Sequence, residues 1–282
     1  MAFVPKKVPP PSLHLLGHPE SDTEYRHFQV ALEGGLSAPA VTTMPFDHAA
    51  HAFSPINAWW LADAALLAYW DESTAAERFQ TGAGLSSTFF DRDGTQGYVA
   101  SNGQFAIVAF RGTQPDEGAD LWTDLDFVPR PWERGGRVHE GFMRGLNAVW
   151  VDVAGAVTRS GATRVWFTGH SLGGALAVLA ADRFESAAGV YTIGSPRVGD
   201  PEFVGSFNAR HENRSFRYVN QHDFVTRVPP EAVGFGHVDV EMRFDLDPGA
   251  SLIPRALADH TPRLYATYMW NAIVAAVGPA AL

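Results

Sequence analysis

The chain has 282 residues, no cysteine and a formal net charge of -10 at pH 7, and 46% of its residues are hydrophobic. This length and apolar content suit one large α/β domain better than two small ones. The acidic balance argues against binding of nucleic acid or of anionic lipid, because both carry phosphate charge, and favours a neutral substrate. Without cysteine there is no disulfide, no thiolate nucleophile and no cysteine-based zinc site.

Residues 1–53 carry prolines and histidines but no sustained hydrophobic period, which predicts an irregular N-terminal extension. The spacing of these histidines fits neither a helical histidine pair nor a zinc pattern, so no metal site is predicted. The first residues are basic but lack an apolar segment, so no signal peptide is visible. We therefore expect a cytoplasmic protein, or a secreted one whose signal is already removed.

Residues 54–282 are predicted to form a single domain that begins with a helix. Ser54-Pro55 has the sequence of an N-cap followed by the first helical position. The helical pattern continues to about Phe79, and its aromatic residues, Trp59 and Trp60 among them, are expected to lie in the core.

From Leu85 the pattern changes to short strands joined by tight turns. Strands are predicted over 87–90, 97–100 and 105–110, with turns at 91–94 and 102–103. The third strand is apolar throughout, as expected for a central strand. It ends in Arg111-Gly-Thr113.

The segment 114–127 follows that strand directly and has an unusual composition. It begins with proline, glycine and acidic residues and then carries a large aromatic residue, Trp122. A hinged lid that covers a site and opens on an apolar surface fits this composition. An ordinary loop followed by a core tryptophan is the alternative. Further on, His139 opens a helical pattern through Leu146 and Val153 and is interpreted as structural.

The segment 165–174, Val-Trp-Phe-Thr-Gly-His-Ser-Leu-Gly-Gly, is an apolar strand that ends on a glycine-flanked serine and continues into an alanine-rich helical pattern. This order is typical of a nucleophile elbow, a sharp turn from strand to helix that holds a reactive serine; a glycine-lined structural turn is the alternative. Gly169 and Gly173 allow the close approach, and Ser171 is expected to be strained and exposed. In such an elbow the residue after the serine and the loop after an early central strand supply the oxyanion hole. Leu172 and Thr113 are therefore predicted to form it.

Six motifs in this order resemble the class 3 lipases, the filamentous-fungus type of triacylglycerol lipase. They are Phe110-Arg-Gly-Thr113, Trp122-Thr-Asp-Leu-Asp-Phe127, His139-Glu-Gly-Phe142, Gly169-His-Ser-Leu-Gly-Gly174, Gly194-Ser-Pro-Arg-Val-Gly199 and Val219-Asn-Gln-His-Asp223. The resemblance implies an α/β-hydrolase fold, with a mostly parallel central sheet flanked by helices, ester hydrolysis and a lid over the active site. It places Thr113 at the family's oxyanion position and Trp122 at its lid tryptophan. The stretch between these two residues is a few residues longer and more acidic than in the best-known members of the family, and the disulfides of many secreted relatives are absent.

The rest of a catalytic triad follows from chain order, because enzymes with this elbow place the acid and then the histidine after the serine. The candidate bases are His211, His222, His237 and His260. Asp223, in the loop after a strand predicted over 216–220, is the predicted acid. His222 is expected to point away from it, His211 comes too early, and His237 lies in a strand predicted over 237–244. His260, just before a helix predicted over 262–277, is therefore the predicted base.

These roles predict a serine carboxylic-ester hydrolase that works through an acyl-enzyme and needs no metal or organic cofactor. A lipase acting on acylglycerols, at a lipid-water interface, is the favoured reading. The alternatives are a soluble esterase for short-chain or feruloyl-type esters, a phospholipase A1-like activity, and an inactive hydrolase fold that serves as a binding module. The C-terminal helix is too short to span a bilayer and is expected to pack on the core.

Overall fold

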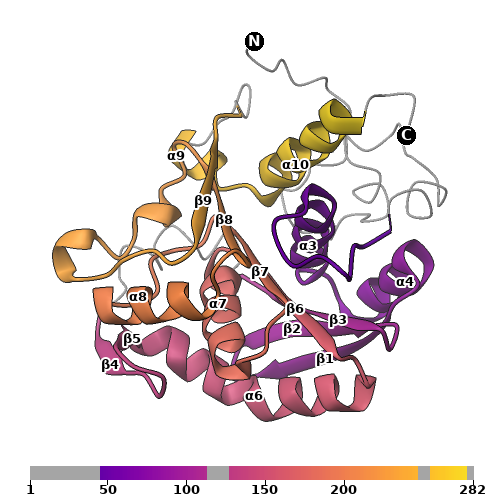
Figure 1. The fold of residues 1–282 in the computed structure, drawn as a ribbon, viewed down its shortest axis with the longest axis horizontal. Coiled ribbons are helices and arrows are strands. Elements are labelled where there is room, and N and C mark those ends of the chain that lie inside the picture. The colour runs from indigo at the N-terminus through magenta and orange to yellow at the C-terminus, as the bar shows by residue number, and fades with distance from the viewer. Residues whose placement is uncertain (1–44, 113–126, 247–254, 278–282) are drawn as a thin grey trace.

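A computed structural model of the chain describes residues 45–112, 127–246 and 255–277 (Figure 1). The strands are β1 Ser86–Arg92, β2 Thr95–Ser101, β3 Phe105–Phe110, β4 Pro129–Pro131, β5 Arg137–His139, β6 Arg164–His170, β7 Gly189–Ile193, β8 Ser215–Asn220 and β9 Val240–Phe244. The helices are α3 Pro55–Leu67, α4 Glu72–Ala83, α6 Glu140–Ser160, α7 Leu172–Phe184, α8 Pro201–Arg210, α9 Arg255–Ala258 and α10 Pro262–Val277, with short 3-10 helices η2 Val225–Arg227 and η3 Glu231–Val233.

Within these ranges seven strands form one sheet, in the order β1-β2-β3-β6-β7-β8-β9, and β4 pairs with β5 separately. The first three strands form an antiparallel meander. From β3 onward each strand runs parallel to its neighbour. The mostly parallel sheet flanked by helices that the sequence predicts is thus confirmed, and the carboxyl ends of β3, β6, β7 and β8 meet at one edge.

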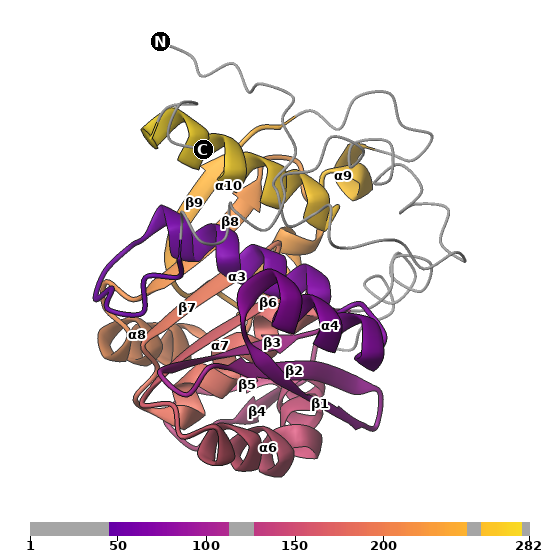
Figure 2. The same cartoon turned by 90° about the vertical axis from the view of Figure 1, so that its right-hand side faces the viewer.

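Helices cover both faces of the sheet. The helices α3, α4 and α10 pack on one face, and α6, α7 and α8 on the other (Figure 2). Successive side chains of a strand point to opposite faces, so β3 contributes to both cores: Phe105 and Ile107 to the first, Val108 and Phe110 to the second. This explains why β3 is apolar at every position, as the sequence predicts for a central strand.

The single helix predicted from residue 54 to about 79 is wrong, because the chain forms two helices there. The helix α3 ends at Leu67, and α4 begins after Asp71, whose carboxylate accepts the N–H of Thr74 at 3.0 Å. Hydrogen bonds from Ser73 and Thr74 hold the pKa of this carboxyl at about 2. A charged N-cap favours a new helix start at this point. The helical pattern of apolar residues runs across this point in the sequence, so the pattern alone does not predict the break between α3 and α4.

The C-terminal helix α10 spans the predicted range and packs on the core as expected. Its Trp270 is fully buried and lies 5.3 Å, between ring centroids, from Trp59 of α3. None of the helices in the described ranges has the length and apolarity that a bilayer span requires.

Two further segments refine the predicted outline. Residues 45–53 form turns, and among them Phe46 stacks on Phe105 with 4.6 Å between ring centroids. The strand predicted over 237–244 begins only at Val240. Asp239 before it has φ 79°, a left-handed conformation that breaks the extended chain, and Nε2 of His237 lies 2.7 Å from the carbonyl oxygen of Thr226.

Candidate active site

The nucleophile elbow lies between β6 and α7. Ser171 has φ 59° and ψ -129°, a conformation that costs an L-residue roughly 1–3 kcal/mol. Its N–H donates to the carbonyl oxygen of Ile193 at 2.9 Å. A Cβ on Gly169 would collide with the main chain of Gly173, and one on Gly173 with the carbonyl of Phe110. The glycines therefore allow strand, turn, helix and the neighbouring β3 to approach closely, as their spacing predicts.

Ser171 itself is buried, so the prediction that it stands exposed is wrong. Only 1% of its surface is accessible. The strand β6 runs between β3 and β7, and the chain that leaves β3 lies directly against the turn. A Cβ on Gly112 would stand 3.1 Å from Cβ of Ser171. The sequence of the turn does not show that the segment after β3 packs against it, so the burial of Ser171 could not be predicted from the motif.

Asp223 and His260 lie in contact, one in the loop after β8 and the other just before α10. Nδ1 of His260 is 2.8 Å from Oδ2 and 3.0 Å from Oδ1 of Asp223. Asp223 is fully buried, and its Oδ1 also accepts the N–H of Val225 at 2.9 Å. Because a carboxylate only accepts hydrogen bonds, this contact assigns the proton of a neutral His260 to Nδ1 and leaves Nε2 as the basic nitrogen.

A third side chain at this pair, Tyr265, was not predicted from the sequence. Its hydroxyl donates to Oδ2 of Asp223 at 2.5 Å and accepts the N–H of Asn220 at 3.0 Å. Burial raises the pKa of the Tyr265 hydroxyl well above its usual value, and the negative charge of Asp223 raises it further, so the hydroxyl stays a donor. The only signal in the sequence is a tyrosine in the first turn of the helix after His260.

Gly194, at the end of β7, connects the elbow with the acid-base pair. It has φ 57°, and a Cβ there would lie 2.9 Å from Oδ2 of Asp223 and 3.1 Å from Nδ1 of His260. The preceding residue, Ile193, accepts the N–H of Ser171. The end of β7 thus brings the serine turn and the Asp223–His260 pair to one place at the carboxyl edge of the sheet.

The predicted oxyanion hole is described only in part. Leu172 is the first residue of α7 and is half-buried, and N–H groups of the first helical turn have no acceptor within the helix. Thr113 and the predicted lid residue Trp122 lie outside the described residues. Their roles, and that of Leu172, stay predictions.

The other predicted candidate histidines make structural contacts away from Asp223. His211 follows α8, with Nε2 3.6 Å from Oδ1 of Asp182. His237 contacts the main chain of η2, as described above. His139 caps α6 by accepting the N–H of Gly141 at 3.1 Å, in agreement with its structural interpretation.

His222, predicted to point away from Asp223, lies in a cluster with Asp245 and Asp259. An imidazole and two carboxylates are metal-ligating groups, but here Arg255 lies against both acids. Its Nη2 donates to Oδ1 of Asp245 at 2.7 Å, and its Nε is 3.6 Å from Oδ2 of Asp259. The chain's own guanidinium therefore contacts both carboxylates, and the cluster ties the segment before His260 to the end of β9.

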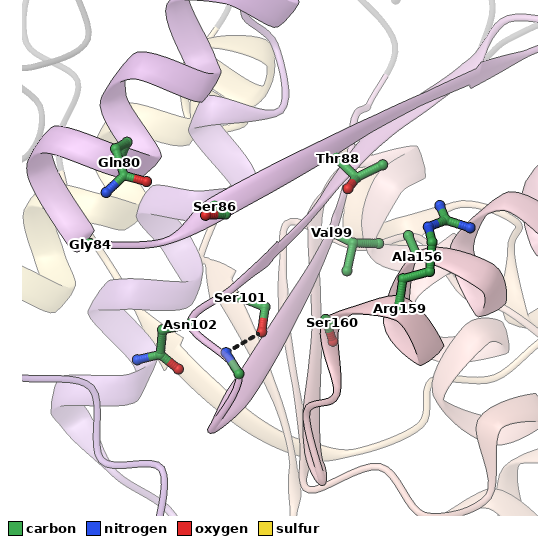
Figure 3. Close-up of a pocket in the computed structure, with 11 residues that line it drawn as sticks. Gln80, Gly84, Ser86, Thr88, Val99, Ser101, Asn102, Ala156, Arg159 and Ser160 are labelled. Atoms are coloured by element: carbon green, nitrogen blue, oxygen red, sulfur yellow. Dashed lines mark hydrogen bonds between the residues drawn. The ribbon is translucent and has the colours of Figure 1, made fainter.

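A pocket of about 460 Å³ lies at the opposite edge of the sheet (Figure 3). It is lined by residues of α4, the β1–β2 hairpin and the C-terminal end of α6. The turn after β2, where Ser101 Oγ accepts the N–H of Gly103 at 3.0 Å, borders it. Since Ser171 follows the carboxyl end of β6, and Phe105 pairs with Arg164 at the start of that strand, this pocket is separate from the elbow.

Comparison with known proteins finds similarity to one family. A family model described as lipase (class 3) matches residues 107–233. A lipase of Rhizopus niveus is 35% identical over 162 residues, covering 52% of this chain and 41% of that protein, so the chain spans about two fifths of this relative's length. The solved structure of lipase II from Rhizopus niveus superposes with a TM-score of 0.58 at 27% identity, over 70% of this chain and 83% of that one. A solved triacylglycerol lipase whose catalytic centre is formed by a serine protease triad superposes with a TM-score of 0.56 at 25% identity, over 66% of this chain and 78% of that chain.

The fold shared with these structures is the α/β-hydrolase fold, which confirms the predicted fold class. The range matched by the family model contains both the Ser171 elbow and Asp223. The motifs, the sheet and the relatives agree, and residues 107–233 of the chain match the class 3 lipase family.

Proposed function

We propose that this chain is a serine ester hydrolase that acts as a lipase on acylglycerols. The observation that carries the proposal is the Asp223–His260 contact of 2.8 Å at the same edge of the sheet as the strained Ser171 turn. The match of residues 107–233 to the class 3 lipases and the named lipases among the relatives favour acylglycerols as the substrate class.

In the first half of the proposed reaction, Nε2 of His260 removes the proton of Ser171 Oγ as this oxygen attacks the ester carbonyl carbon. Asp223 orients the imidazole and stabilises its charged form. The N–H groups of Leu172 and Thr113 hold the negative oxygen of the tetrahedral intermediate, each contributing about 3 kcal/mol of transition-state stabilisation. His260 then gives its proton to the leaving alcohol.

In the second half, His260 removes a proton from water, and the resulting hydroxide attacks the acyl-enzyme at the same carbonyl carbon. The bond to Ser171 Oγ breaks, the serine takes the proton back, and the fatty acid leaves. These steps use only groups of the chain and water.

The test is the initial rate of tributyrin hydrolysis as the concentration rises through the solubility limit, with Ser171→Ala measured beside the wild type. A rise in rate when droplets form, absent in the variant, is the expected result for a lipase acting at an interface. Saturation below the solubility limit, still dependent on Ser171, would replace the lipase assignment by that of a soluble esterase. Equal rates for the two proteins would overturn both.

A further inference from the structure

Behind the elbow, one tyrosine and one histidine connect three parts of the site. The hydroxyl of Tyr69, just after α3, lies 2.8 Å from Nδ1 of His170. This hydroxyl also accepts the N–H of Gly112, the residue before Thr113. On the far side of the imidazole ring, Nε2 of His170 lies 2.7 Å from the carbonyl oxygen of His260.

The donor and the acceptor of each hydrogen bond in this series, from Gly112 through Tyr69 and His170 to His260, can be assigned. The carbonyl oxygen of His260 only accepts, so Nε2 of His170 carries a proton and donates it. Burial, and the nearby His260 ring, lower the pKa of His170 well below its usual range, so the ring is neutral and Nδ1 has a lone pair. The Tyr69 hydroxyl therefore donates to Nδ1, while its oxygen accepts from Gly112.

This arrangement is more specific than core packing requires. His170 is buried, and its ring lies 4.4 Å, between centroids, from the ring of His260. An apolar side chain would fill the same space without the cost of burying two polar nitrogens. A buried polar chain in which each group is paired fixes one relative placement of the segments that it joins.

We propose that Tyr69 and His170 are positioning residues, which hold the main chain at Gly112 and at His260 in register with the serine elbow. The inference rests on the proposed function, because its consequence is catalytic. Gly112 leads into the predicted oxyanion residue Thr113, and His260 is the proposed base. This series of hydrogen bonds thus fixes the main chain at Gly112 and at His260 relative to the elbow, although neither positioning residue touches the reacting atoms.

The first test is Tyr69→Phe, which removes only the hydroxyl. Loss of register by about 1 Å costs on the order of a hundredfold in rate, so we expect kcat for a short-chain p-nitrophenyl ester to fall about tenfold to a hundredfold. KM should stay within about twofold, because substrate binding is not altered. Labelling of Ser171 by an alkyl fluorophosphonate, which needs the base and the oxyanion donors but no ester turnover, should slow by the same factor as kcat.

The matched control is Tyr98→Phe. Tyr98 is fully buried, and its hydroxyl donates to the carbonyl oxygen of Trp70 at 2.7 Å. This variant also deletes one tyrosine hydrogen bond in the same core, but no contact with Gly112, His170 or His260. It should lose stability while kcat and the labelling rate remain those of the wild type.

A second pair of variants tests the histidine. In His170→Gln the amide nitrogen can occupy the place of Nε2 and still donate to the carbonyl oxygen of His260. In His170→Asn the shorter side chain ends where Nδ1 lies, so it can contact Tyr69 but not His260. We expect His170→Gln to be labelled faster than His170→Asn, a difference that a purely space-filling role does not produce.

The outcomes separate this inference from the proposed function. Wild-type kcat and labelling in Tyr69→Phe, or equal loss in Tyr98→Phe, would overturn the positioning role. A wild type that is labelled but hydrolyses no ester would overturn the proposed function alone, and the labelling rates of the variants would still decide the positioning role. A wild type whose Ser171 is not labelled would overturn both.

Discussion

The hydroxyl of Tyr265 donates to the same oxygen of Asp223, Oδ2, that lies 2.8 Å from Nδ1 of His260. The carboxylate is buried and accepts from a phenol, an imidazole and the N–H of Val225. Hydrogen bonds from several donors to one buried carboxylate fix its orientation. Tyr265 therefore helps to hold Asp223 oriented toward the proposed base.

Replacing Tyr265 by Phe should lower both activity and stability. The variant loses a bond to a charged acceptor and leaves the N–H of Asn220 without the hydroxyl oxygen that it contacts at 3.0 Å. A buried group that loses its partner costs about 1–3 kcal/mol. We expect that loss in urea unfolding and a fall in kcat of about tenfold, measured with a soluble ester.

The control for that variant is Tyr268→Phe in the same helix. The Tyr268 ring stacks on Phe244 at 4.1 Å between centroids, and Tyr265 contacts the same phenylalanine at 5.1 Å. Removal of the Tyr268 hydroxyl should leave kcat unchanged. Equal activity of the two variants would show that the Tyr265 hydroxyl has no part in catalysis.

Gly194→Ala should abolish activity by displacing the acid-base pair. The new Cβ would lie 2.9 Å from Oδ2 of Asp223 and 3.1 Å from Nδ1 of His260, at a residue with φ 57°. The left-handed backbone costs about 1–2 kcal/mol for an alanine, and the collision adds to this cost. We expect ester hydrolysis to fall at least about a hundredfold.

Gly161→Ala separates the two effects. Gly161 ends α6 with φ 69°, and a Cβ there would have nothing within 4 Å. This variant carries the backbone strain without a collision, so it should lose stability and keep full activity. If Gly194→Ala also keeps full activity, the pair is not held against Gly194 as the structure shows.

The residues that could be predicted from the sequence are those whose role is tied to chain order or to a local motif. The elbow follows from one strand, two glycines and a serine, and the choice of Asp223 and His260 followed from their order after Ser171. Their contact brings together two loops 37 residues apart.

The role of Tyr265 depends on tertiary contacts, and no local pattern marks this residue. Gly194 opens one of the six motifs, but its close approach to Asp223 and His260 is also a tertiary contact. The same limit explains why Ser171 is buried rather than exposed: Gly112, which lies against it, belongs to a different strand end. The division between α3 and α4 is a different case, because the capping sequence Asp71-Glu-Ser-Thr74 is present but lies within a helical apolar pattern.

The strain at Ser171 can be measured by comparing two inactive variants. Ser171→Ala keeps a Cβ at φ 59°, whereas Ser171→Gly relieves the strain. We expect neither variant to hydrolyse esters and the glycine variant to be more stable in urea unfolding by about 1–2 kcal/mol. A glycine variant no more stable than the alanine variant would mean that the elbow is not strained in the folded chain.

The buried ring of His237 should make the protein less stable in acid. Burial lowers the pKa of His237 from its usual 6.5 to about 3, and the charge of Arg217 acts in the same direction. Below about pH 6.5 the unfolded chain takes up a proton on this ring, and the folded chain does not until about pH 3. Stability contributed by the neutral ring is therefore present above pH 6.5 and is lost as the pH falls toward 3.

His237→Gln tests this source of acid sensitivity. The amide can still donate to the carbonyl oxygen of Thr226, which Nε2 of His237 contacts at 2.7 Å, but it does not titrate. Between pH 6 and 4 we expect the slope of the unfolding free energy against pH to become shallower by about one proton, or about 1.4 kcal/mol per pH unit. Measurement at pH 8, where the ring is neutral in both states, gives the packing cost of the substitution and serves as the reference. An unchanged slope would show that His237 takes up its proton equally in the folded and unfolded chains.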